Sequence, residues 1–337
     1  MLTVLTALTL VVLAAVTILN GFHDASNAVG AAVRTRALTP GVAIIVVAVF
    51  TFLGALVASG LGASLVAHFD VAVHPGPDGP LPLLAGLIAA GGWGLFTWWK
   101  GQPSSSTHAV ISGVAGASTA TALITGGDLA GGASLLLRAV VVPLVLTTLL
   151  APLLAFVLAA VFVWSMRSLA PKTVDRTGRA VQSIGTCTQA LAHGLQDGQR
   201  SAAIAVTALA SVGTGLPHTI TPWVPAAAGA LLAIGVLGGG WRITHTLSTR
   251  LVTLDPLRAG AANVSTAALL FVGAFTFHLP VSSTQAITGS LVGAGRYQRH
   301  PTVNWATARR IGGYWLATPV VCGLGAAVLA LAASPLV

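Results

Sequence analysis

The chain has 337 residues, of which 55% are hydrophobic and only 7% are charged. Soluble domains carry about 25% charged residues, so this composition excludes a soluble globular protein and predicts a polytopic membrane protein. The apolar runs are continuous rather than alternating, which argues against an outer-membrane barrel. The formal charge of +9 comes from basic residues scattered over short loops. That distribution is typical of cytoplasmic loops and argues against nucleic-acid binding.

Apolar segments predict the membrane helices of the first half. The first segment is interrupted by polar residues at Gly21–Asn27, where we expect the helix to break. The segments are expected at residues 2–33, 41–67, 82–99, from Gln102 to about Thr125, and 133–166. The loop 68–80 has no Lys or Arg and is predicted to lie outside, with the N-terminus. The basic segment 167–179 is predicted to be a cytoplasmic linker.

The second half repeats this pattern in the opposite orientation. Its first segment is expected to break at Gly194–Arg200, and its basic loop 242–258 is predicted to be cytoplasmic, whereas the matching loop of the first half lies outside. The segments are expected at 180–212, 223–240 and 261–279, in a second Ser-rich stretch, and at 311–333. The chain is therefore predicted to be all-α. Two inverted repeats, 1–166 and 180–337, would each have about five membrane segments, with broken helices or re-entrant segments at the midplane.

An aspartate motif occurs once in each half. Gly21-Phe22-His23-Asp24 and Gly194-Leu195-Gln196-Asp197 lie 173 positions apart, each inside an apolar run. An aspartate at the centre of a membrane helix costs about 2.5–3.5 kcal/mol on insertion scales, so a charged residue there indicates a function. Two such residues at matching places in two halves indicate a transporter.

A hydroxyl motif is also repeated, 177 positions apart. It reads Pro103-x-Ser105-Ser106-Thr107-His108-Ala109 in one half and Pro280-x-Ser282-Ser283-Thr284-Gln285-Ala286 in the other. Proline followed by small hydroxyl residues suits the start of a half-helix, where free N–H groups favour an anion. The alternative is N-capping with small-residue helix packing. The symmetric placement favours an oxyanion site, with these predicted ligands: Ser105, Ser106, Thr107, Ser282, Ser283, Thr284, Gln196 and Gln285.

The acidic motifs are the candidates for the coupling cation. We expect Asp24, Asn27, Asp197 and His23 to bind or carry it, because carboxylate and amide oxygens suit Na⁺ and a buried Asp suits H⁺. The alternative for Asp197 is a structural pair with Arg200, three residues on. The histidines have no compact ligand spacing, so no metal site and no cofactor are expected.

These motifs resemble the signatures of the inorganic phosphate transporter (PiT) family. The resemblance rests on Gly21-x-x-Asp24-x-x-Asn27, His193-Gly194-x-x-Asp197-Gly198-Gln199-Arg200 and both hydroxyl motifs, and it covers nearly the whole chain. It implies low-affinity phosphate uptake coupled to H⁺ or Na⁺ by an inverted-repeat helical fold in the inner membrane of a bacterium. Some bacterial members are thought to carry a neutral metal–phosphate complex. A homodimer is also implied.

The chain departs from the family pattern at three positions. His23 and Gln196 stand where the family usually has Asn before each Asp, and Gln285 stands where the second hydroxyl motif usually ends in His. The ion site is therefore expected to differ from that of Na⁺-coupled members, and His23 beside Asp24 favours H⁺.

The predicted function is import of inorganic phosphate by cation symport, with no chemistry done on the substrate and no enzyme activity. The first alternative is a sulfate permease with the same mechanism. A channel or scaffold without coupling is a second alternative, against which the paired intramembrane Asp argue. An intramembrane enzyme, for instance a His/Asp protease or an acyltransferase, is a third, but Ser, His and Asp recur as matched pairs rather than as one triad.

Overall fold

The computed structural model describes residues 2–57, 79–126, 138, 141–166, 171–211, 221, 223–277, 279–296 and 303–334. Helices make up nearly all of this part of the chain, and its only β-structure is one isolated bridge between Val252 and Val303. Seven described helices are long and apolar enough to cross a membrane, or up to eight if a bent pair counts as one span. The prediction of an all-α polytopic membrane protein is confirmed. The predicted outside loop 68–80 lies almost entirely outside the described residues.

Each half contributes five helical segments to the described structure, which matches the number of segments predicted. The first half contains α1 (Leu2–Arg34), α2 (Pro40–Val57), α4 (Pro80–Trp99), α5 (Ser106–Thr125) and α7 (Val142–Ser165). The second contains α8 (Pro171–Ala210), α9 (Trp223–Gly238) with α10 (Trp241–His245) and the π-helix η3 (Thr246–Leu251), α11 (Pro256–Val272) with the π-helix η4 (Gly273–Phe277), α12 (Ser283–Gly295) and α13 (Trp305–Ala333).

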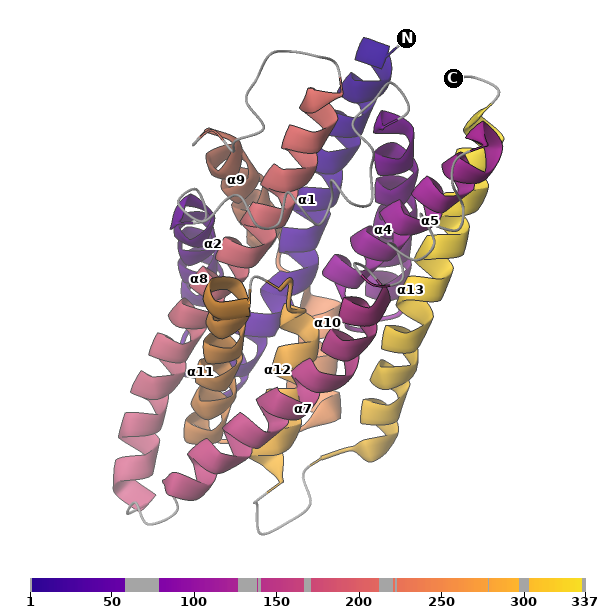
Figure 1. The fold of residues 1–337 in the computed structure, drawn as a ribbon. Helices are drawn as coiled ribbons and strands as arrows, with labels where there is room; N and C mark the ends of the chain where they lie inside the picture. The colour runs from indigo at the N-terminus through magenta and orange to yellow at the C-terminus, as the bar shows by residue number, and fades with distance from the viewer. Residues whose placement is uncertain are drawn as a thin grey trace.

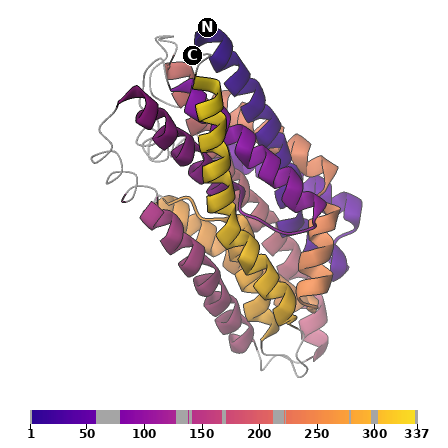
Figure 2. The ribbon, with the colours of Figure 1, turned by 90° about the vertical axis from the view of Figure 1, so that its right-hand side faces the viewer.

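Equivalent helices of the two repeats exchange partners. Helix α1 packs against α9 while α8 packs against α2, and α5 packs against α13 while α12 packs against α7. In both Figures 1 and 2 the start of α1 and the end of α13 lie at the same end of the molecule. In Figure 1, α4 and α5 occupy the upper part and α11, α12 and α7 the lower part, whereas α8 and α13 run most of the height. The two repeats are therefore inverted and interlocked.

Glycines of the aspartate motifs hold these interlocked helices together. A Cβ atom added to Gly21 of α1 would lie 2.0 Å from the carbonyl oxygen of Leu232 on α9. A Cβ atom on Gly194 of α8 would lie 1.9 Å from the carbonyl oxygen of Thr51 on α2. Only glycine permits such close backbone approach. The two repeats thus use the same motif glycine for the same helix crossing.

The breaks expected within the aspartate motifs are absent. Helix α1 runs unbroken through Gly21–Asn27, and α8 runs unbroken through Gly194–Arg200. The polar side chains find partners on neighbouring helices, so the backbone keeps its own hydrogen bonds. Helix α8 also begins at Pro171, so most of the segment 167–179 that was expected to be a linker is helical.

Irregular backbone lies elsewhere in the described chain. Helix α9 and the segment Trp241–Leu251 are bent by 63° at Gly239, which has a φ of 58°. The turn Gly101–Ser105 between α4 and α5 is buried. Non-helical backbone at membrane depth is tolerated only inside protein or beside a water-filled cavity. The start of α5 and the start of α12 are both buried, so the two hydroxyl motifs lie inside the molecule.

Candidate functional site

Two polar stripes face each other where α1 and α8 meet. The spacing i, i+4, i+7 places the three residues of each stripe on one helix face. All six are at most 5% exposed. They are Asn20, Asp24 and Asn27 on α1, and His193, Asp197 and Arg200 on α8, each pair again 173 positions apart.

Asp24 lies against the hydroxyl motif of the second repeat. The hydroxyls of Ser283 and Thr284 donate hydrogen bonds to its carboxylate oxygens, at 2.8 Å and 3.1 Å. The Asn27 amide donates to the same two hydroxyls, at 3.4 Å and 3.2 Å. Four of the residues predicted for coupling and binding therefore form one buried cluster across the two repeats.

Asp197 sits in the corresponding cluster but has a cation beside it. The Asn20 amide donates to one carboxylate oxygen at 2.8 Å, and His193 Nδ1 lies 3.0 Å from the same oxygen. Arg200 Nη1 lies 3.0 Å from the other oxygen, and Arg200 also donates to the hydroxyl of Thr107. The second aspartate motif thus reaches the hydroxyl motif of the first repeat through Arg200.

The first serine of each hydroxyl motif caps a helix. The Ser105 hydroxyl accepts from the backbone N–H of His108 at 3.1 Å, and the Ser282 hydroxyl accepts from that of Gln285 at 3.3 Å. Each cap satisfies one N–H, while the N–H groups of the first helical residues have no partner within their helix. His108 and Gln285 occupy equivalent positions in the two motifs. His108 Nδ1 lies 3.2 Å from Gln285 Nε2. The two helix starts therefore come close together.

His23 and Gln196 occupy equivalent positions and brace the turns before the hydroxyl motifs. His23 Nε2 lies 3.4 Å from the Thr97 hydroxyl, which lies 2.9 Å from that of Ser104. The Gln196 amide donates to Leu270 O at 2.6 Å and accepts from Val281 N–H at 2.9 Å. Both polar groups of Gln196 are thus engaged with backbone. Its contact with substrate stays a prediction, and its structural role is to position the second motif.

Replacing Gln196 by Met is expected to lower the free energy of unfolding by about 2 kcal/mol, because a buried N–H and a buried C=O lose their partner. Thermal unfolding of purified protein in detergent measures this effect. Gln182→Met is a matched control, since neither amide atom of buried Gln182 has a partner in the described part of the chain. Equal losses for the two variants would contradict the bracing role.

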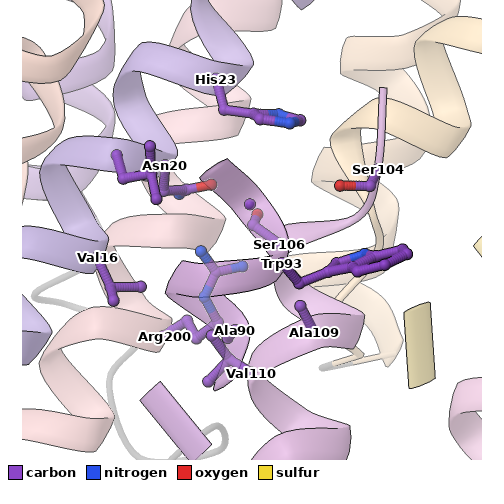
Figure 3. Close-up of a pocket in the computed structure, with 12 residues that line it drawn as sticks. Val16, Asn20, His23, Ala90, Trp93, Ser104, Ser106, Ala109, Val110 and Arg200 are labelled. Atoms are coloured by element: carbon purple, nitrogen blue, oxygen red, sulfur yellow. The ribbon is translucent and has the colours of Figure 1, made fainter. Parts of the chain in front are cut away.

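A small cavity adjoins the two stripes (Figure 3). It has a volume of about 30 Å³, room for about two water molecules, and its polar lining comes from α1, α8 and the α4–α5 turn. In Figure 3 the side chains of Asn20 and Arg200 extend toward Ser106, with His23 and Ser104 further along the wall. Ser106 and His23, both predicted site residues, thus border the same space as Arg200.

Asp24, His193 and Asp197 form a compact donor set. One ligand atom from each lies within 4.8 Å of the others, and all three residues are buried. Carboxylate oxygens suit hard cations and imidazole suits transition metals. Histidine spacing alone gave no indication of this group, because it combines one histidine with two aspartates from different repeats.

Sequence reasoning missed Asn20 and underrated Arg200. Asn20 stands at the position equivalent to His193, and Arg200 at the position equivalent to Asn27. Applying the same 173-residue offset to the neighbours of the two aspartates would have found both.

Comparison with known proteins gives consistent results. The model of the phosphate transporter family matches residues 20–180 and again residues 167–326. A probable low-affinity inorganic phosphate transporter from Bacillus subtilis is 33% identical over 328 residues, which cover 96% of each chain. One from Rhizobium meliloti is 34% identical and covers 94% of this chain and 92% of its own. A solved structure titled "The sodium-dependent phosphate transporter" has a TM-score of 0.76, 18% identity and coverage of 99% of this chain and 100% of its own.

Proposed function

Because the chain belongs to the phosphate transporter family, we propose that it imports inorganic phosphate by symport with H⁺ or Na⁺. The observation that carries the proposal is the contact between Asp24 and the hydroxyls of Ser283 and Thr284. This contact joins the candidate cation ligand directly to the helix start that would bind the anion. Double matching of the family model over most of the chain supports phosphate as the substrate.

The anion would bind between the starts of α5 and α12. Free backbone N–H groups, the helix dipoles and the hydroxyls of Ser106, Thr107, Ser283 and Thr284 supply donors there. Together with the caps Ser105 and Ser282 these are the predicted substrate residues. Gln285 would contribute through its contact with His108.

The charge of Asp24 accounts for obligatory coupling. In this structure its carboxylate already accepts both hydroxyl hydrogens of the α12 start, so it occupies the donors that phosphate needs. It would also repel an incoming anion in a buried site, where charges interact strongly. A cation bound to Asp24, or a proton on it, removes the charge and frees the hydroxyls. Phosphate binding therefore requires the cation.

Different observations favour the two cations. His23 Nδ1 and His193 Nδ1 lie 3.4 Å and 3.8 Å from Asp24 oxygens, and imidazoles beside a carboxylate suit proton transfer. The surrounding hydroxyl and amide oxygens suit Na⁺. His23, Asp24, Asn27 and Asp197 would hold the coupling ion in either case.

A metal–phosphate complex is a second candidate form of the substrate. The donor set of Asp24, His193 and Asp197 could hold a divalent ion carried with the anion, and it lies beside the proposed phosphate site. Such an ion would be cargo. Phosphate uptake that is abolished by a chelator and accompanied by equal uptake of the metal would support this form, whereas chelator-resistant uptake would support free phosphate.

The long apolar helices suit a lipid bilayer, and we propose that the protein lies in a bacterial-type plasma membrane. The α7–α8 connection is proposed to lie in the cytoplasm, because basic residues gather there. The N-terminus is proposed to lie outside. In Figure 1 the end of α7 and the start of α8 lie at the end opposite to the start of α1.

Uptake of radiolabelled phosphate into proteoliposomes tests the proposal. We expect accumulation driven by an imposed pH gradient, by a Na⁺ gradient, or by both, and little competition from sulfate, which carries no proton at neutral pH. Accumulation under the pH gradient without Na⁺ would identify H⁺ as the coupling ion. Sulfate accumulation without phosphate accumulation would overturn the proposed substrate, and phosphate entry that ignores both gradients would overturn symport.

A further inference from the structure

The two repeats carry equivalent three-residue stripes that differ at the first and third positions, and only the third position adds a permanent charge. Asn20 corresponds to His193 and Asp24 to Asp197, and both aspartates are buried carboxylates. The third position is Asn27 in the first repeat and Arg200 in the second. A neutral amide and a permanent cation therefore occupy equivalent places.

The two third-position side chains make equivalent contacts. The Asn27 amide donates to Thr284 at 3.2 Å, and Arg200 donates to Thr107, which is the same position of the other hydroxyl motif. Arg200 Nη1 also lies 3.0 Å from the Asp197 carboxylate. A guanidinium group stays charged at any physiological pH. The Asp197 site thus holds a cation that belongs to the protein.

The Asp24 site lacks such a cation in the described part of the chain. Its ionisable neighbours there are His23 on α1 and His193 on α8, which are charged only when protonated, and the carboxylate of Asp197, which is an anion. Asn27 Oδ1, which stands at the place equivalent to the Arg200 guanidinium, is a buried atom with no hydrogen-bond partner among the described residues, as is Asn20 Oδ1 beside Asp197. An unpaired buried carbonyl oxygen is costly, and it would be satisfied by a bound cation or by the O–H of a protonated carboxyl. The first site is therefore open to a cation at the place where the second is filled.

From this asymmetry we infer that Arg200 takes the place of a second coupling cation. One cation binds at Asp24 and Asn27 in each transport cycle, and the Asp197 site is permanently neutralised from within. This inference rests on the proposed function, because it sets the number of cations that accompany each phosphate.

The number of cations moved per phosphate tests the inference. In proteoliposomes that number follows from the cation gradient that balances an opposing phosphate gradient. Wild type is expected to move one cation, Arg200→Lys one, and Arg200→Asn two, because Asn would recreate the open site of the first repeat beside Asp197. An unchanged number in Arg200→Asn, or two cations in wild type, would overturn the inference.

A charge exchange provides a sharper variant. In the double variant Asn27→Arg/Arg200→Asn the fixed cation moves to Asp24 and the open site moves to Asp197. One cation per phosphate is expected again, but Asp197→Asn should now abolish coupling. If coupling in the double variant still depended on Asp24 and not on Asp197, the inference would be wrong.

A binding measurement covers the case in which Arg200→Asn does not transport. Cations bound per purified protein molecule in the presence of phosphate can be counted with radiolabelled Na⁺, and with a pH indicator when Na⁺ is absent. We expect the number to rise from one to two, and no rise would overturn the inference. If wild type transports no phosphate at all, the proposed function fails instead, so the two failures are distinguishable.

Discussion

Asp24→Asn is expected to reduce gradient-driven phosphate uptake by about 100-fold. Asparagine keeps the size of the side chain but cannot carry a proton and binds cations weakly. The coupling cation therefore loses its charge-assisted contact with the carboxylate, worth about 1.5–3 kcal/mol, and every 1.4 kcal/mol is a factor of ten. Initial rates of uptake into proteoliposomes under the coupling gradient measure the effect.

Asp255→Asn is the matched control for this variant. Asp255 caps the start of α11 by accepting from the N–H of Arg258 at 3.0 Å, and Asn is an equally good cap. Its side chain is about one-third exposed and lies away from both stripes. We expect normal uptake from this control. Gradient-driven uptake that survives in Asp24→Asn would show that the coupling site lies elsewhere.

Gly194→Ala is expected to destabilise the protein by about 3 kcal/mol or more, the upper range for overpacking. The new Cβ atom would lie 1.9 Å from the backbone oxygen of Thr51, and backbone cannot rotate away as a side chain can. Helices α8 and α2 would have to separate, which would also displace Asp197, three residues further along α8. The melting temperature in detergent and the yield of folded protein measure the loss.

Gly313→Ala controls for the substitution itself. Gly313 lies within α13, and a Cβ atom there would meet no atom of the described structure within 4 Å. Alanine is a better helix former than glycine by about 0.5–1 kcal/mol, so this variant should be as stable as wild type or more so. If the Gly194→Ala and Gly313→Ala proteins had the same melting temperature, the proposed close crossing of α8 and α2 would be refuted.

Much of the architecture could be predicted from two offsets in the sequence. The aspartate motifs are 173 positions apart and the hydroxyl motifs 177, and together with the opposite loop charges they predict two inverted repeats. They also identify Asp24, Asp197 and both hydroxyl motifs as parts of one site. The prediction of the fold is confirmed, because a repeated fold places equivalent residues in equivalent surroundings. The structure also brings these side chains together, and their role as one site stays a prediction.

The path of α1 and α8 could not be predicted in the same way. A run such as Gly21–Asn27 inside an apolar segment has the composition of a broken helix. In the structure the glycine serves a helix crossing, and the polar residues are satisfied by side chains from the other repeat. Local composition does not reveal such distant partners, so it suggested a break where the helix is continuous.

Arg200 illustrates a second limit. Its spacing from Asp197 predicts a local ion pair, and that pair is present. The additional contact with Thr107 depends on where the start of α5 lies relative to Arg200, which sequence spacing along one helix cannot show. Because Arg200 is equivalent to Asn27, the ion pair between Arg200 and Asp197 marks a difference in charge between the two repeats.

The most direct test of the account is a structure of the protein determined with phosphate and the coupling cation bound. We predict phosphate between the starts of α5 and α12, within hydrogen-bonding distance of Ser106, Thr107, Ser283 and Thr284. With Na⁺ bound we predict the ion at Asp24 and Asn27, and with H⁺ a protonated Asp24 that no longer accepts from both hydroxyls. Phosphate bound away from both helix starts, with the Asp24 contacts unchanged, would contradict the account.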